Sequence, residues 1–153
     1  MAMSSWNSPE WPALCAGSGC PICRRGKPDG VVLELTSSYL TSSANAPMRG
    51  YSCVVLKRHA VELYELSDDE AIGFTRDVQR VSKAIQELTG AIKLNYEIHG
   101  NTIPHLHLHL YPRHRGDPFE GGPIDPRLIK SPPYKANEFE KFVAELRTRL
   151  AGG

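Results

Sequence analysis

Three histidines alternate with leucines in residues 104–112, which read Pro-His-Leu-His-Leu-His-Leu-Tyr-Pro. Because successive side chains of a β-strand point to opposite faces, this pattern predicts a strand with His105, His107 and His109 on one face. The leucines on the other face are suited to a buried core, and the prolines lie at the ends of the run, where a strand tolerates them. The chain is therefore expected to contain a sheet with one apolar face and one face of imidazoles.

A face with three imidazoles favours a chemical role, because imidazole acts as nucleophile, proton carrier or metal ligand near neutral pH. Two other interpretations stay open: a polar strand surface without a function, and a surface that stores metal ions. Metal storage predicts further histidine or acidic residues close by in the sequence, and His99 and His114 are the candidates.

Residues 100–113, Gly-Asn-Thr-Ile-Pro-His-Leu-His-Leu-His-Leu-Tyr-Pro-Arg, resemble the signature of the histidine-triad (HIT) superfamily. Residues 50–59, Gly-Tyr-Ser-Cys-Val-Val-Leu-Lys-Arg-His, together with Glu62-Leu63 and residues 66–70, resemble the upstream part of the same domain. The resemblance covers roughly residues 20–115. It implies a HIT-like α+β fold and an enzyme that acts on nucleotides.

The resemblance implies that His107 is a nucleophile that attacks the α-phosphorus of a nucleotide. It also implies that His109 contacts the phosphate or the leaving group. A nucleotidyl-histidine intermediate divides one difficult displacement into two easier steps. One nitrogen of His107 must keep its lone pair, so the other is expected to donate to a backbone carbonyl. The implied substrates are dinucleoside polyphosphates or nucleoside phosphoramidates; the alternative is a zinc-stabilised nucleotide-binding module without turnover.

Four polar residues near the histidines are candidate substrate-binding residues: Asn95, Asn101, Thr102 and Arg113. Their amide, hydroxyl and guanidinium groups can donate to phosphate oxygens. The alternatives are structural, since asparagine commonly forms turns and arginine is commonly a solvated surface residue.

The chain departs from the family pattern at two positions. Tyr51 follows Gly50 where many HIT proteins have a histidine that supports the triad. The acidic residue that usually holds the ribose hydroxyls would fall near Ser43, where the chain offers only Ser43 and Asn45. The second departure predicts weak discrimination among nucleosides.

Cys20 and Cys23 form a Cys-x-x-Cys pair, whose thiolates can share one tetrahedral metal ion if two further ligands are present. The resemblance implies that His59 and His105 complete a structural zinc site. Cys15 is a spare candidate ligand, and Cys53 is expected in the core. A pair of reduced thiols or a redox pair stays open, although a thioredoxin-like motif requires a βαβ context that this sequence lacks.

The chain has 153 residues, of which 41% are hydrophobic and 23% charged, as expected for one globular domain. Residues 1–19 are expected to be a loose leader and residues 20–153 a single HIT-like domain. A net charge of +1 argues against an extended nucleic-acid surface and permits a local site for a small anionic ligand. The sequence shows neither an apolar run of membrane-spanning length nor a signal peptide, so a cytoplasmic protein without a membrane partner is expected.

The sequence predicts strands over residues 31–35, 39–42, 51–56, 92–98 and 105–111, with the last two forming a hairpin. A capping box of Ser67 and Glu70 begins a long helix that ends at Gly90. Residues 116–133 are expected to be irregular, and Asn137 to cap a C-terminal helix. The fold class is thus α+β, with an antiparallel sheet of about five strands, one long central helix and a C-terminal helix.

The long helix carries apolar residues at alternating spacings of three and four, which makes a narrow stripe: Ala71, Phe74, Val78, Val81, Ile85 and Leu88. The stripe predicts packing on the chain's own sheet. Packing against the same helix of a second copy is the alternative, and the resemblance implies a homodimer.

Overall fold

The computed structural model describes residues 5–130 and 132–152. Its centre is an antiparallel sheet of five strands in the order β1-β2-β3-β5-β4. The strands are β1 (Val31–Glu34), β2 (Ser38–Ser42), β3 (Ser52–Leu56), β4 (Lys93–Ile98) and β5 (His107–Arg113). The predicted α+β class and the predicted antiparallel pairing of the last two strands are confirmed.

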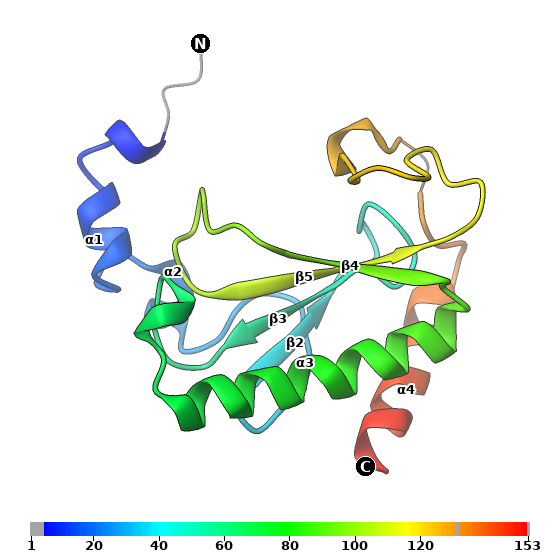
Figure 1. Cartoon of the computed structure of the whole chain (residues 1–153), viewed down its shortest axis with the longest axis horizontal. Helices are drawn as coiled ribbons and strands as arrows, with labels where there is room; N and C mark the ends of the chain where they lie inside the picture. The colour runs from blue at the N-terminus through cyan, green and yellow to red at the C-terminus, as the bar shows by residue number, and fades with distance from the viewer. Residues whose placement is uncertain (1–4, 131, 153) are drawn as a thin grey trace.

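The helices divide into a large pair on one face of the sheet and short elements near its two ends (Figure 1). The pair consists of α3 (Asp68–Thr89) and α4 (Glu138–Ala151). The short elements are η1 (Ser5–Asn7), α1 (Trp11–Cys15), α2 (Pro21–Arg25), η2 (Leu63–Glu65) and η3 (Pro126–Leu128). The N-terminal helices lie at one end of the sheet, and the irregular segment after β5 lies over the other end.

Helix α3 begins and ends as its sequence predicts. The Ser67 hydroxyl accepts from the Glu70 amide and the Glu70 carboxylate accepts from the Ser67 amide, while Gly90 ends the helix in the left-handed conformation. The apolar stripe of α3 packs on the chain's own sheet, which confirms that interpretation. Asp77 is buried on the same helix and accepts from the hydroxyl of Ser38 at 2.7 Å, so its polar group is satisfied.

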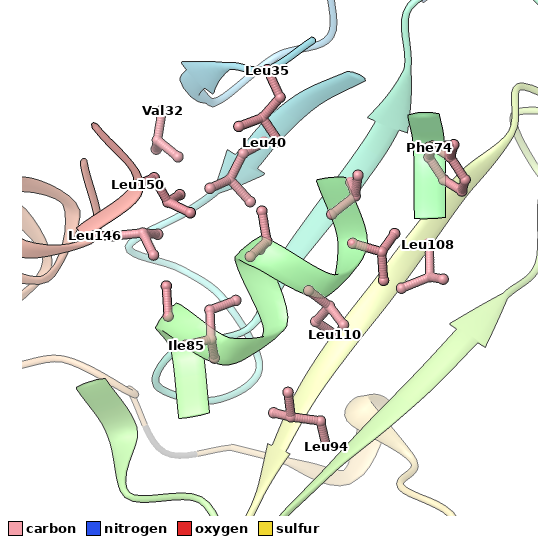
Figure 2. Close-up of a cluster of buried hydrophobic side chains, with 14 of the residues drawn as sticks. Val32, Leu35, Leu40, Phe74, Ile85, Leu94, Leu108, Leu110, Leu146 and Leu150 are labelled. Carbon is pink, nitrogen blue, oxygen red and sulfur yellow. The ribbon is translucent and has the colours of Figure 1, made fainter. Parts of the chain in front are cut away.

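The main core lies between the sheet and the two large helices (Figure 2). Leu108 of β5 lies toward Phe74 of α3, and Leu110 of β5 lies nearer to Ile85. Leu146 and Leu150 of α4 extend the same cluster toward β1 and β2. Burial of each such side chain is worth about 1.5–3 kcal/mol. The leucine face of β5 is thereby fixed against α3, and the alternate side chains of β5 must point to the opposite face.

The expectation that one strand carries all three histidines is wrong, because β5 begins at His107. Before the strand the chain bends: the amide of His105 donates to the carbonyl of Ile103, and the amide of Leu106 donates to the carbonyl of Ala60. His105 is therefore buried beside the N-terminal helices, while His107 and His109 lie on the sheet.

Two expectations about the chain ends have different outcomes. Asn137 does not cap α4 with its side chain, because its backbone is left-handed at φ 63° where an N-cap residue is normally extended; the backbone amide of Lys135 instead donates to the Glu138 carboxylate. The expected leader contains η1 and α1 in its described part, while residues 1–4 lie outside the described residues. Among the described residues no helix combines the length and apolar character needed to cross a bilayer.

Candidate active site and metal centre

The face of the sheet opposite α3 carries the side chains of His107, His109 and Tyr111 from β5. The neighbouring strand β3 pairs Val55 with His107 and Cys53 with His109. This surface, called here the histidine face, is bordered by the N-terminal helices at one end and by the segment after β5 at the other (Figure 1).

His107 presents a single free ring nitrogen. Its Nδ1–H donates to the backbone carbonyl of His105 at 2.6 Å, as the sequence analysis expected. The hydrogen bond places the ring proton on Nδ1, so Nε2 keeps its lone pair. A neutral imidazole with an available Nε2 can act as a nucleophile.

His109 stands beside His107, with ring centroids 4.7 Å apart in an edge-on arrangement. Its Nδ1 lies 2.7 Å from the hydroxyl of Tyr51 and 3.3 Å from the thiol of Cys53. Burial, together with the nearby His107 and His99, lowers the pKa of His109 to about 4. His109 is therefore neutral at physiological pH.

Tyr51 and Cys53 are site residues that the sequence analysis did not assign. Cys53 was expected in the core; it is half-buried on the histidine face and only borders a small apolar cluster around Val55. The strand period could have shown this, because Cys53 and Val55 alternate with the buried Val54. Burial raises the pKa of Tyr51 well above its usual range, so its hydroxyl keeps its proton.

A second titratable pair lies at the end of β4 next to the site. Glu97 pairs across the strands with His109, and its carboxylate lies 2.8 Å from Nε2 of His99. The His99 ring is 5.5 Å from the His109 ring. The pair extends the row of ionisable groups from the histidine face toward solvent.

Four side chains from three parts of the chain converge beside the first residues of β5. The ligand atoms of Cys20, Cys23, His59 and His105 all lie within 4.8 Å of one another. Nδ1 of His105 is 3.4 Å from Nδ1 of His59, 3.4 Å from Sγ of Cys20 and 3.6 Å from Sγ of Cys23. The structure thus brings together the four residues that the sequence analysis grouped as a metal site.

The spacing of these atoms fits a tetrahedral ion. With metal–nitrogen bonds of about 2.0–2.1 Å and metal–sulfur bonds of about 2.3 Å, adjacent nitrogens lie about 3.3–3.4 Å apart, and a nitrogen and a sulfur about 3.5–3.6 Å. Partial burial and the neighbouring Cys20 raise the pKa of Cys23 to about 11, so two adjacent thiolates require a cation to stabilise them. The four-residue set is a possible metal centre.

Hydrogen bonds outside the cluster orient both histidine ligands. Nε2–H of His59 donates to the carbonyl of Cys15 at 2.8 Å, and Nε2–H of His105 donates to the carbonyl of Leu56 at 2.8 Å. Both rings thereby turn an unprotonated Nδ1 to the cluster, as metal-binding histidines do. Cys15, the spare candidate, contributes its carbonyl here. Gly17 has φ +86°, and a Cβ at this position would lie 3.0 Å from the His59 ring, so a larger residue would crowd this ligand.

His105 joins the two sites. Its ring belongs to the four-residue cluster, and its carbonyl accepts the hydrogen bond from His107. The position of the His107 ring therefore depends directly on a residue of the cluster.

Arg113, a candidate phosphate contact, is buried and fully hydrogen-bonded within the protein. Its guanidinium makes a two-point contact with Asp117 at 2.7 and 2.8 Å, and also donates to Asn95 and to the carbonyls of Phe119 and Gly122. These bonds hold the pKa of the Asp117 carboxyl well below its usual range. The arginine ties the segment after β5 to the end of the sheet.

The remaining candidates occupy different places. Asn95 lies on β4 opposite Tyr111 and accepts from Arg113. Asn101 and Thr102 lie on the exposed connection between β4 and β5, where the carbonyl of Asn101 accepts from the indole of Trp6.

A cavity of about 590 Å³ lies beyond His109 on the same face. Tyr51 and Tyr111, whose rings each lie 6.0 Å from that of His109, form its inner wall. The other described lining residues come from the loop after β2 and from the segment around η3: Ala44, Asn45, Ala46, Pro47, Pro126, Arg127, Ile129, Lys130, Pro132 and Pro133. The cavity combines aromatic walls with two cationic side chains.

Curated relatives share most of the chain. It is 29% identical over 121 residues to adenosine 5'-monophosphoramidase hnt1 of Schizosaccharomyces pombe, which covers 73% of this chain and 91% of that protein. It is 28% identical over 102 residues to an uncharacterised HIT-like protein of Methanocaldococcus jannaschii, covering 64% and 79% of the two chains.

Solved structures show the same fold. A histidine triad protein from Bradyrhizobium japonicum matches with a TM-score of 0.69 at 28% identity, over 78% of this chain and 89% of that one. A zinc-bound histidine triad family protein from Mycobacterium smegmatis matches with a TM-score of 0.58 at 23% identity, over 93% and 92%. The HIT domain family model matches residues 24–116, more than half of the chain, and those residues include β3, α3 and both histidines of β5. The chain therefore belongs to the HIT family.

Proposed function

We propose that this protein is a nucleotide hydrolase or nucleotidyl transferase that acts on dinucleoside polyphosphates or nucleoside phosphoramidates. The observation that carries the proposal is the hydrogen bond from Nδ1–H of His107 to the carbonyl of His105. This bond leaves a nucleophilic Nε2 on an open sheet face beside a neutral His109. The phosphoramidase activity named for the Schizosaccharomyces pombe relative belongs to the same reaction class.

The reaction consists of two displacements at one phosphorus atom. In the first, the Nε2 lone pair of His107 forms a P–N bond, and the bond from phosphorus to the leaving phosphate or amine breaks with its electron pair on the leaving group. Solvent supplies the proton that neutralises that group, and the neutral His109 can donate a hydrogen bond to it. In the second, a water or phosphate oxygen attacks, the P–N bond breaks, and His107 regains its lone pair. When water attacks, its proton passes to solvent.

Substrate recognition is proposed to centre on phosphate groups. Asn101 and Thr102 lie on the exposed connection that leads to His105 and can fold over a bound phosphate. Asn95 and Arg113 are proposed to shape the site by holding the segment after β5, and the internal hydrogen bonds of Arg113 favour this role over direct phosphate contact. The cavity beside Tyr51 and Tyr111 has the size to hold the rest of the substrate.

The metal is proposed to be zinc, because two thiolates and two imidazoles in a tetrahedron are the ligand set that Zn²⁺ prefers. Cys20, Cys23, His59 and His105 would hold it, and a zinc-bound HIT protein shares the fold. When bound, the ion supplies a structural link between the N-terminal segment and the residues before β5.

Three further proposals concern organisation, assembly and location. Residues 20–153 are proposed to be the HIT-like domain. The segment before it contacts this domain through the carbonyl of Cys15, which accepts from the His59 ring. The edge strand β4 exposes Tyr96 and Ile98, and Ile92 just before the strand is exposed as well; these side chains are suited to a second copy of the chain in a homodimer. The four free cysteines support a cytoplasmic protein.

The decisive experiment is turnover of diadenosine polyphosphates and adenosine 5'-phosphoramidate by the zinc-loaded protein and by His107→Ala. The native protein should release AMP, and rapid quenching should trap an acid-labile nucleotidyl adduct on His107. His107→Ala should lose at least ~10³-fold in kcat. His114→Ala, an exposed histidine just after β5, is the matched control and should retain full activity. Nucleotide binding without any turnover in the native protein would establish the binding module instead.

A further inference from the structure

Three polar atoms meet at the inner side of the His109 ring. The hydroxyl of Tyr51 is 2.7 Å from Nδ1 of His109 and 3.2 Å from Sγ of Cys53, and that sulfur is 3.3 Å from the same Nδ1. A neutral imidazole has one nitrogen that donates and one that accepts. The partner of Nδ1 therefore decides whether the other nitrogen, Nε2, carries the ring proton.

We propose that Tyr51 is a positioning residue whose hydroxyl donates to Nδ1 of His109, so that the proton of this ring stays on Nε2. Nε2–H is then the group that His109 offers to the substrate. It can donate a hydrogen bond to a phosphate oxygen or to the leaving group as that group departs. The inference rests on the proposed function only for its effect on turnover.

The chemistry of the three atoms favours this direction. The contact between the Tyr51 hydroxyl and Nδ1 has the length typical of a hydrogen bond from a hydroxyl, and a phenol is a stronger donor than a thiol. Cys53 can donate its S–H to the oxygen of Tyr51, so that the protons of both the thiol and the phenol are hydrogen-bonded. The sequence of donors then runs from Cys53 to Tyr51 to His109.

The backbone around Tyr51 is held on both sides, so its hydroxyl has a defined position. The amide of Gly50 donates to the hydroxyl of Tyr134 at 2.8 Å, and the carbonyl of Tyr51 accepts from the hydroxyl of Ser42 at 2.9 Å. Gly50 has φ +81°, and a Cβ there would lie 2.5 Å from Thr89, so this turn requires glycine. The Tyr51 ring also stacks on that of His109 at an interplanar angle of 25°.

The test uses the full-length, zinc-loaded protein and reads the tautomer directly. Two-bond proton–nitrogen NMR correlations of the imidazoles show which nitrogen carries the proton, and His109→Asn assigns the His109 signals. The native His109 should carry its proton on Nε2. Tyr51→Phe should populate the Nδ1–H form, whereas Tyr39→Phe, which removes a hydroxyl 3.4 Å from the carbonyl of Gly26, should leave the His109 signals unchanged.

Steady-state kinetics distinguish a change in the position of His109 from a general loss of folded protein. Tyr51→Phe should lower kcat about tenfold, the effect of one lost hydrogen bond, with little change in KM. In the Tyr51→Phe variant the Cys53 thiol could donate to Nδ1 of His109 in place of the phenol, and the Tyr51→Phe/Cys53→Ala double variant removes this donor as well. A proton on Nδ1 in the native protein, or a native tautomer in the double variant, would overturn the proposal. If the native protein has no turnover, the proposed function fails, yet the NMR result still decides the role of Tyr51.

Discussion

The candidate metal centre and the histidine face use opposite nitrogens of the imidazole ring, although the segment 105–109 contributes histidines to both. In the metal centre, His59 and His105 donate through Nε2–H to backbone carbonyls and turn Nδ1 toward the cysteines. On the histidine face, Nδ1 of His107 is bound to a carbonyl and Nδ1 of His109 to a phenol, so Nε2 is available.

The difference shows that the partner of the second nitrogen determines what a histidine can do. His105 and His107 are two residues apart, and on a continuous strand they would share a face. The bend before β5 separates them, so one ring is buried among the N-terminal helices and the other lies on the open sheet.

The largest effect should come from the same substitution at these two positions. His105→Asn removes a ligand, so it should abolish stoichiometric zinc and lower the melting temperature by about 10 °C or more, since structural zinc contributes several kcal/mol to folding. His107→Asn should keep the zinc and the melting temperature within ~2 °C and lose turnover. Elemental analysis and thermal unfolding measure both.

A strong chelator should reproduce the His105→Asn phenotype in the native protein and have no further effect on that variant. Zinc bound stoichiometrically by His105→Asn, or a metal-free native protein with an unchanged melting temperature, would contradict the assignment of the cluster.

A smaller effect, on the free energy of unfolding, is expected when the pH is lowered. The folded pKa of His109 is about 4 and the unfolded value is near 6.5, so the unfolded chain binds the extra proton between these values. The His109 contribution to stability is constant above about pH 6.5 and decreases as the pH falls toward about 4. His109→Asn should remove about 1–2 kcal/mol of this pH dependence, after allowance for solvent near a partly exposed ring.

Urea unfolding of the native protein and of His109→Asn at pH 7.5 and pH 5 measures that difference, because the metal centre affects both proteins equally. The groups that face His109 are unchanged in the variant: His107, His99, Glu97, Tyr51 and Cys53. Equal pH dependence in the two proteins would show that His109 is protonated as readily in the folded as in the unfolded chain.

The smallest effect concerns the base of the substrate. If the histidine face recognises phosphate and Ser43 does not hold the ribose, purine and pyrimidine nucleotides and their deoxy forms should differ in affinity by about tenfold at most. Competition by matched nucleotides measures this. A much stronger preference for one ribonucleotide would indicate a dedicated contact, for which Asn45 at the cavity wall is the candidate.

The regular parts of the fold were predictable because local patterns determine them. The capping box of Ser67 and Glu70, the stop at Gly90 and the alternation around Leu108 and Leu110 each correspond to a structural element. The grouping of Cys20, Cys23, His59 and His105 came from a family resemblance, since nothing local relates Cys20 to a residue 85 positions away.

Other features depended on contacts that the sequence does not display. The bend at His105 follows from hydrogen bonds to distant backbone, including that between Leu106 and Ala60. The left-handed backbone of Asn137 removed its side chain from the cap. The roles of Tyr51 and Glu97 arise from cross-strand register, which brings both beside His109 only when β3, β5 and β4 are adjacent.

The double role of His105 limits how this segment can change in length. One residue inserted or deleted between His105 and His107 would break either the hydrogen bond from the His107 ring to the His105 carbonyl or the place of the His105 ring in the cluster. Neither change could be absorbed by the bend, because the His105 carbonyl and ring are both engaged. The exposed connection at residues 99–103 carries no such double constraint. Loop grafting that alters substrate choice should therefore lengthen this connection and leave the spacing of residues 105–107 intact.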